Sequence, residues 1–275
     1  MKYLQFILLF SLLASTAQAA PAIDLVNKTN TIRCGYVEYV PALNKDVNTG
    51  SWSGFDYDIV NAVADRLQLK ADFTTPAGWA TVVADLDAKK FDMLCSGFWV
   101  HPNVGKFAFF SRPVFYQPVF VVARADDARF TAKTDLNDAA LKMVALEGDN
   151  PVYIAKTDFP RAQTLILPNM TDFSQVLVNV ADKKADFTLV DGYTFGVYNK
   201  NNPGQLKIVS PDHPVRIYPV SYVFGKEDAL LRDAVNVALD EMILDGTMKR
   251  IMDKYNQYPN VYYHAAIAYK KGDKE

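Results

Sequence analysis

The sequence predicts an α/β protein of two similar lobes joined by two extended connections. Three observations support this fold class: an amphipathic helix between two short buried strands, a helix–turn–strand unit that occurs twice, and two long apolar segments rich in β-branched residues. Strands that alternate with helices are typical of parallel α/β sheets. Half of the residues are apolar, which is enough for one large domain or for two lobes with separate cores.

Residues 1–19 have the features of a secretory signal peptide. Lys2 provides a positive start, Leu4–Leu13 an apolar core too short to span a membrane, and Ala17–Ala19 a small-x-small cleavage site. We therefore expect cleavage after Ala19 and export to a soluble compartment. An uncleaved anchor helix is the alternative.

Composition excludes several classes of partner. The 29 Lys and Arg residues nearly balance the 31 Asp and Glu residues, so neither nucleic acid nor an anionic membrane surface is a predicted partner. His101, His213 and His264 are scattered, and the sequence has no HExxH or paired CxxC motif. We therefore predict no metal site and no cofactor.

The first predicted α/β unit is centred on Gly54–Leu69. Gly54 supplies a turn, Asp56 is expected to cap the first free N–H groups of a helix, and Asp58 meets the positive end of the helix dipole. Residues 31–36 and 70–74 are predicted as flanking strands. Apolar residues at helical spacing define the buried face, namely Ile59, Val63 and Leu67. Ligands of such sheets lie at the carboxyl ends of the strands.

Cys34 and Cys95 are the only cysteines, and each lies near the end of a predicted strand. An oxidising compartment permits a disulfide between them. Both strands are expected to be parallel neighbours, however, and disulfide geometry is hard to satisfy there. We therefore favour two buried thiols, with a disulfide as the alternative.

One helix–turn–strand unit is repeated within the chain. Trp79–Asp92 (WATVVADLDAKKFD) and Phe173–Asp186 (FSQVLVNVADKKAD) align at a constant offset, and a short apolar strand follows each. The matched pairs are Trp79 with Phe173, Val82 with Val176, Lys89-Lys90 with Lys183-Lys184, and Asp92 with Asp186. Chance similarity between two helices is the alternative, but recurrence in register favours two similar lobes.

Two apolar segments, Val114–Arg124 and Val215–Phe224, are predicted to be strands that cross between the lobes. Two lobes on a pair of extended connections can close over a small molecule. The expected division is residues 20–113 with 221–275 for lobe 1, residues 119–215 for lobe 2, and residues 114–118 with 216–220 for the hinge.

The order and spacing of these segments resemble the bacterial extracellular solute-binding proteins of the polar amino acid type (family 3), the periplasmic binding proteins of ABC transporters. Gly54-Phe55-Asp56-Tyr57-Asp58 is similar to the signature that opens the family's first long helix. Further similar segments are WATVVADLDAKKFDMLCSG, KFAFFSRPVFYQP, ADFTLVDG and DEMILDGTMKRIMDKY. The resemblance implies a type II periplasmic-binding-protein fold and a monomer that captures a small solute in the periplasm for the permease of an ABC importer.

The resemblance also implies a ligand site between the lobes, at the tips of strands. Carried onto this sequence, its residues are Tyr36, Tyr39, Trp79, Gly97 and Trp99 from lobe 1, and Asp149, Asn150 and Asp191 from lobe 2. Trp79 falls where an aromatic ring stacks on the ligand, and Asp191 where a carboxylate takes the ligand's ammonium group. Asp149 and Asn150 lie at a helix start, where free N–H groups favour an anionic group.

One departure from the family concerns the arginine that clamps the ligand's carboxylate. The Thr-x-x-Arg motif reads His101-Pro102-Asn103-Val104 here, and valine cannot make that bidentate contact. Arg112 or Lys106 could replace it from nearby. Aromatic faces beside Asp191 suit a cation or a ring-bearing amine. His101 is expected to be a surface or capping residue.

Three classes of function follow from these features. The first is a transport receptor without chemistry, and the second is a sensory or accessory binding protein that is not coupled to transport. The third is an enzyme on the same fold, similar to a periplasmic cyclohexadienyl dehydratase, with Glu147 or Asp149 as its general acid. We favour the first class, because an acidic substrate would also need the missing arginine.

Overall fold

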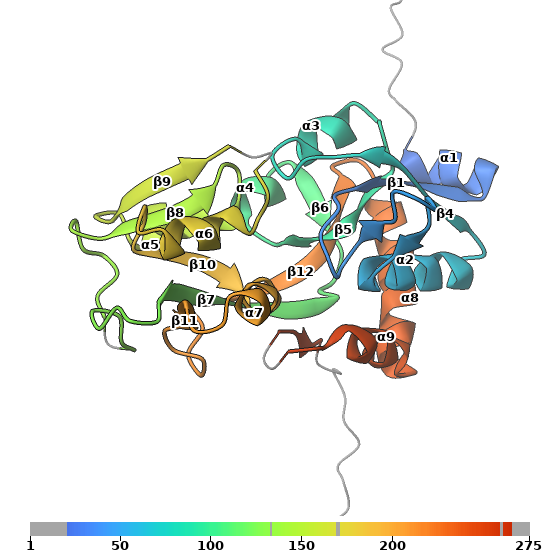
Figure 1. Cartoon of the computed structure of the whole chain (residues 1–275). Coiled ribbons are helices and arrows are strands. Elements are labelled where there is room, and N and C mark those ends of the chain that lie inside the picture. Colours follow the sequence, from blue (N-terminus) through green and yellow to red (C-terminus); the bar gives the residue numbers. More distant parts are fainter. Residues whose placement is uncertain (1–20, 133, 169–170, 259–260, 266–275) are drawn as a thin grey trace, which may run out of the picture.

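The computed structural model describes residues 21–265 except 133, 169–170 and 259–260, so the predicted signal peptide lies outside the described residues. The chain forms two α/β lobes, and two ten-residue strands run between them (Figure 1). These are β7 (Phe115–Arg124) and β12 (Arg216–Gly225). Among the described residues, no helix is both long enough and apolar enough to cross a membrane.

Lobe 1 is built from both ends of the chain. Its elements are α1 (Ala22–Thr29), β1 (Thr31–Tyr36), β2 (Asn44–Lys45), β3 (Trp52–Ser53), α2 (Phe55–Arg66), β4 (Lys70–Pro76), α3 (Val82–Asp87), β5 (Met93–Trp99), α4 (Pro102–Gly105), β6 (Ala108–Phe110), α8 (Ala229–Leu244) and α9 (Thr247–Tyr255). Lobe 2 is one continuous insertion. Its elements are β8 (Lys142–Leu146), α5 (Asn150–Asp158), β9 (Gln163–Leu167), α6 (Gln175–Ala181), β10 (Phe187–Asp191), α7 (Gly192–Asn201) and β11 (Leu206–Ile208).

One sheet path connects the lobes in the order β4-β1-β5-β12-β7-β10-β8-β9. Along this path, the strands within each lobe pair in parallel, as between β1 and β5 or between β8 and β10, and pairing is antiparallel where β12 and β7 join them. Residues 216–220 pair one by one with residues 115–119. The two segments predicted as a hinge therefore lie side by side.

Strands β7 and β10 are covered on both faces where they lie in lobe 2. Val121 packs into one buried cluster and the next residue, Val122, into another, as expected for side chains that alternate across a sheet. Every residue of β10 is buried, which explains why its apolar residues do not simply alternate with exposed polar ones.

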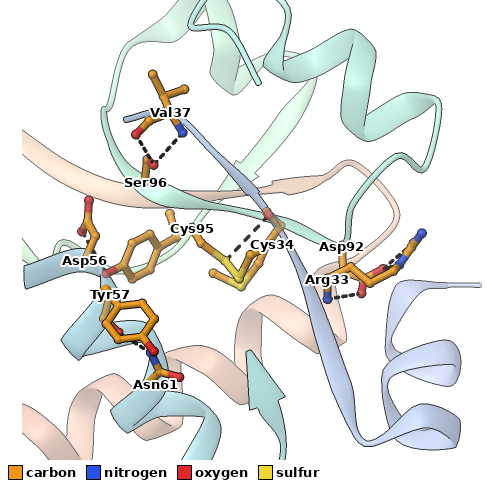
Figure 2. The surroundings of a disulfide bond; sticks show 11 residues. Arg33, Cys34, Val37, Asp56, Tyr57, Asn61, Asp92, Cys95 and Ser96 are labelled. Carbon is orange, nitrogen blue, oxygen red and sulfur yellow. Dashed lines mark hydrogen bonds and ion pairs between the residues drawn. A yellow bond between two sulfur atoms is a disulfide. The ribbon is translucent and has the colours of Figure 1, made fainter. Parts of the chain in front are cut away.

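Cys34 in β1 and Cys95 in β5 form a disulfide, so the prediction of two free thiols is wrong (Figure 2). Cys34 pairs in register with Met93, and Cys95 lies two residues further along the same strand. The Cys95 side chain therefore emerges on the same face of the sheet as that of Cys34. The two Cα atoms are 5.4 Å apart, which is a distance that a disulfide spans.

The repeated unit forms in both lobes. Lys89 and Lys183, at matched positions after α3 and α6, both have positive φ values, of 53° and 62°. Asp92 Oδ2 accepts the backbone N–H of Arg33 at 2.8 Å, and Asp186 Oδ2 accepts that of Lys142 at 2.9 Å. Each aspartate thereby ties the turn of its unit to the first long strand of its own lobe.

The segment after α9 returns to the hinge. Its strand β13 (Tyr263–His264) pairs with β7, and the Tyr262 ring packs against Phe55 and Phe115. Upstream, the Tyr258 ring lies 5.6 Å from that of Tyr193 in α7. This segment therefore contacts both lobes.

Candidate functional site: a cavity between the lobes

A cavity of about 70 Å³ lies between the lobes, with room for roughly five water molecules. Residues of both lobes and of both crossing strands line it: Tyr39, Ala42, Phe55, Asp56, Trp79, Gly97, Phe98, Trp99, His101, Phe115, Gln117, Gly148, Asp149, Asn150, Phe173, Asp191 and Val220. Seven of the eight residues expected at the site are in this set. Tyr36 is not, and its ring packs edge-on against Trp52.

Aromatic side chains of lobe 1 are held rigidly at one side of the cavity. Trp99 stacks on Tyr218 with ring centroids 5.1 Å apart and planes 4° apart, and its Nε1 donates to Gln117 Oε1 at 2.6 Å. Trp79 packs against Phe98 at 5.8 Å. A ligand would meet ring surfaces whose orientation is already set.

His101 occupies one of its predicted places, at the start of a helix, and it also lines the cavity. It occupies the N-cap position of α4 but makes no side-chain capping bond. Its ring lies between those of Phe98 and Tyr153, at 5.7 and 6.2 Å. Burial lowers the pKa of His101, which favours the neutral imidazole at pH 7. Its Nδ1 is buried without a hydrogen-bond partner among the described residues.

Asp191 is 2% exposed and accepts four hydrogen bonds. Its Oδ1 accepts from the backbone N–H groups of Tyr193 and Thr194 at 2.8 and 3.0 Å, which caps α7. Its Oδ2 accepts from Tyr39 Oη at 2.5 Å and from Thr194 Oγ1 at 2.8 Å. Burial and the neighbouring Asp191 charge raise the pKa of Tyr39 well above its usual range. Tyr39 therefore remains a donor and bridges lobe 1 to lobe 2.

Asp149 caps α5 and uses only one of its two oxygens to do so. Its Oδ1 accepts the backbone N–H of Asn150 at 2.7 Å. Burial raises the pKa of Asp149 to about 7; the Asn150 hydrogen bond opposes this shift, and the nearby Asp191 charge adds to it. The group is therefore poised to exchange a proton near neutral pH.

Asp56 does not cap its own helix, contrary to the sequence prediction. Helix α2 begins after Gly54 without a side-chain cap, and Asp56 is fully buried. Its two oxygens accept the N–H of Gly97 at 2.7 Å and the hydroxyl of Tyr222 at 3.1 Å. Burial raises the pKa of Asp56 to about 7, while both hydrogen bonds lower it. The carboxyl group thus joins α2 to β5 and β12 at the cavity wall.

Positive side chains do not reach the cavity within the described part of the chain, whose lining contains three aspartates and no Lys or Arg. Arg112 forms an ion pair with Asp240 in α8, and its backbone N–H donates to Asn236. Lys106 is exposed and does not line the cavity. Neither takes the position of the missing clamp. Over the same residues, no cluster of His, Cys, Asp and Glu is arranged to hold a metal ion.

Two α/β lobes, two crossing strands and a cavity between them define a type II periplasmic-binding-protein fold. The family model of the bacterial extracellular solute-binding proteins, family 3, matches residues 32–258, and the chain belongs to this family.

Its relatives include both binding proteins and enzymes. The chain is 27% identical over 243 residues to a probable amino-acid ABC transporter-binding protein of Haemophilus influenzae, covering 88% of this chain and 91% of that one. It is 22% identical over 252 residues to the cyclohexadienyl dehydratase of Pseudomonas aeruginosa, covering 90% and 91%.

Solved structures show the same fold. The ancestral amino acid-binding protein AncCDT-1, described as a precursor of cyclohexadienyl dehydratase, is 27% identical with a TM-score of 0.73, covering 86% of this chain and 99% of that one. A solute receptor for L-cysteine from Neisseria gonorrhoeae is 17% identical with a TM-score of 0.72, covering 88% and 99%.

Proposed function

We propose that this protein captures a small, amine-bearing organic solute in the periplasm and delivers it to an ABC importer. The observation that carries the proposal is the cavity lining, in which rigid aromatic rings and three aspartates occur without a Lys or Arg among the described residues. Rings attract cations through their faces, and carboxylates pair with ammonium groups. A ligand that binds through its own carboxylate would find no cationic partner in this lining.

Contacts across the cleft support a closing mechanism. Tyr39 reaches Asp191 and Thr194, and His101 stacks against Tyr153. Gly148 of lobe 2 also lies close to Ala80 of lobe 1, since a Cβ added to Gly148 would be 3.1 Å from the Ala80 Cβ. These contacts must break before a ligand can leave. The expected division of the chain at residues 114–118 and 216–220 places the bending at the paired segments of β7 and β12.

The same proposal includes the export of the protein, the removal of its signal peptide and its partner in the membrane. Cleavage after Ala19 would release the mature chain as a soluble periplasmic monomer. Its membrane partner would be the permease of the importer, as the family of ABC-transporter binding proteins implies. The chain would perform no chemistry on the solute.

Isothermal calorimetry with the purified mature chain tests the proposal. We expect at least one organic amine to bind, and Trp79→Ala to weaken that binding about tenfold or more through the loss of a ring face. Val237→Ala, which truncates an exposed side chain of α8, is the matched control and should bind normally. Deleting the gene should abolish uptake of the bound amine. Unchanged uptake would overturn coupling to an importer and support the sensory or accessory function.

An enzymatic function is the second candidate, because one relative is a dehydratase and Asp149 has a pKa of about 7 at the cavity wall. A carboxyl group with that pKa can act as a general acid near neutral pH. Incubation with a cyclohexadienyl carboxylate, followed by NMR, should show no loss of water from the compound. Turnover that Asp149→Asn abolishes would establish the enzyme instead.

A further inference from the structure

We propose that Asp149, rather than Asp191, holds the cationic group of the ligand, and that the ligands are amines that carry no carboxylate. The inference rests on the proposed function, because it concerns the same cavity. It assigns the specificity of that cavity to one side chain at the start of α5. It also names the chemical class that this side chain selects.

The hydrogen-bonding capacity of Asp191 is already used within the protein. A carboxylate offers about four lone-pair sites, and Asp191 receives four donors: two backbone N–H groups of α7, the Thr194 hydroxyl and the Tyr39 hydroxyl. An ammonium group could reach this carboxylate only by displacing Tyr39, which would break a bond that joins the two lobes. Asp191 is therefore a closure residue in this arrangement.

Asp149 has the opposite arrangement. It is partly exposed and lines the cavity. Its Oδ1 accepts one backbone N–H, and its Oδ2 accepts no hydrogen bond from any residue that the structure describes. A protonated amine in the cavity would complete the partners of this oxygen with a charge-assisted hydrogen bond, which is among the stronger contacts that a carboxylate can make.

The same arrangement disfavours a carboxylate on the ligand. Free N–H groups at a helix start attract anions, but here the Asn150 N–H already donates to Asp149. The site's own carboxyl group has thus taken the place of a ligand anion at the start of α5. Asp56 and Asp191 also line the cavity, so a second anion from the ligand would meet repulsion rather than a partner.

Matched pairs of an amino acid and its decarboxylated amine test both parts of the proposal, namely the role of Asp149 and the lack of a carboxylate on the ligand. The pairs are phenylalanine with phenethylamine, histidine with histamine, arginine with agmatine, and ornithine with putrescine, titrated at pH 8 by calorimetry into the full mature chain. For any pair that binds, we expect the amine to bind at least tenfold more tightly than its amino acid.

Asp149→Asn should reduce the ratio of the amine's affinity to the amino acid's affinity at least tenfold. The asparagine side chain retains an oxygen that can accept the Asn150 N–H, so the variant should melt within a few degrees of the parent. Asp149→Ser, which also keeps a capping oxygen, should show the same loss of selectivity. Asp191→Asn should weaken both members of a pair equally and leave their ratio unchanged. Asp212→Asn removes the same charge from an exposed position and should change neither affinity.

Each outcome decides one of the two proposals. If none of the eight compounds binds, the proposed function is overturned. If amino acids bind as tightly as the amines, or if Asp191→Asn rather than Asp149→Asn removes the preference, the assignment of Asp149 is overturned while the proposed function stands.

Discussion

The two lobes share one structural unit but differ at the strand tips that face the cavity between them. In both units a helix, a lysine with positive φ and an aspartate bonded to the neighbouring strand recur at matched positions. Beyond that aspartate the units diverge. Strand β5 ends in Gly97, Phe98 and Trp99, whereas β10 ends in Asp191, which caps the next helix.

This difference separates two tasks. Lobe 1 supplies most of the aromatic surface, and at the β5 tip Ser96 Oγ exchanges hydrogen bonds with the backbone of Val37 (Figure 2). Lobe 2 supplies the carboxyl groups at two helix starts, Asp149 and Asp191. The scaffold of the repeated unit is retained where it supports the sheet, and its sequence has changed where the ligand would be bound.

The disulfide makes the largest difference between the lobes, because both cysteines belong to lobe 1. Cys34→Ala with Cys95→Ala should lower the free energy of unfolding by about 2–4 kcal/mol. All three tryptophans lie in lobe 1, so their fluorescence reports on that lobe in a urea titration. We expect the fluorescence transition to move to lower urea while part of the circular dichroism transition does not. Equal shifts by both probes would show that the lobes unfold as one unit.

The matched aspartates should differ in their effect on stability. Asp92 is 1% exposed and accepts hydrogen bonds from the Arg33 guanidinium as well as from its backbone. Asp92→Ala should therefore cost about 2–3 kcal/mol, because the Arg33 backbone N–H and the partly exposed Arg33 guanidinium both lose their acceptor. Asp186 is more exposed and pairs with Arg129 near solvent, so Asp186→Ala should cost about 1 kcal/mol. Equal losses of unfolding free energy in urea titrations of both variants would contradict this ranking.

Sequence reasoning succeeded where a signal is local or periodic. The strand at Thr31–Tyr36 and the repeated unit formed as predicted, because alternation of apolar residues and turn chemistry depend on near neighbours. It failed where the outcome depends on tertiary register. The Cys34–Cys95 bridge requires a diagonal offset between strands, and the partners of Asp56 come from β5 and β12. No local pattern carries that information.

The location of the cavity could be predicted better than its hydrogen bonding. Seven of the eight residues that the family resemblance implied at the site line the cavity, since the topology of an α/β sheet brings strand tips and helix starts together. That Asp191 is saturated, and that one Asp149 oxygen has no donor among the described residues, follows only from counted hydrogen bonds. A residue type at a position does not reveal how much of its bonding capacity remains for a ligand.

Binding of an amine should depend on pH, because the Asp149 carboxyl group, and the Asp56 carboxyl group at the cavity wall, exchange protons in the neutral range. The pKa values of Asp149 and Asp56 are both about 7, and a cation prefers the ionised form that exists above that pH. Affinity for phenethylamine, or for the tightest amine of the panel, should rise between pH 6 and 8. Below pH 7 it should fall by up to about tenfold per pH unit for each carboxyl group involved.

Calorimetry in buffers of different ionisation enthalpy would detect the matching release of protons on binding near pH 7. In Asp149→Asn the dependence should be weaker, since one of the two titrating groups is removed. An affinity that stays constant from pH 6 to 8 in the parent protein would contradict the assignment of Asp149 to cation binding.

The smallest expected effect concerns the hydrogen bond that joins the lobes. Tyr39→Phe removes the donor from lobe 1 but keeps the ring that packs 5.7 Å from Phe173. Loss of this one bond should cost about 1 kcal/mol of closure free energy, which corresponds to roughly fivefold weaker binding of every ligand. Small-angle scattering of the unliganded variant should show a larger radius of gyration than the parent protein. Because Asp191 keeps its three donors from lobe 2, the amine-to-amino-acid ratio should not change. A changed ratio would mean that Tyr39 and Asp191 contact the ligand directly, and that lobe 2 presents Asp191 to the ligand as well as Asp149.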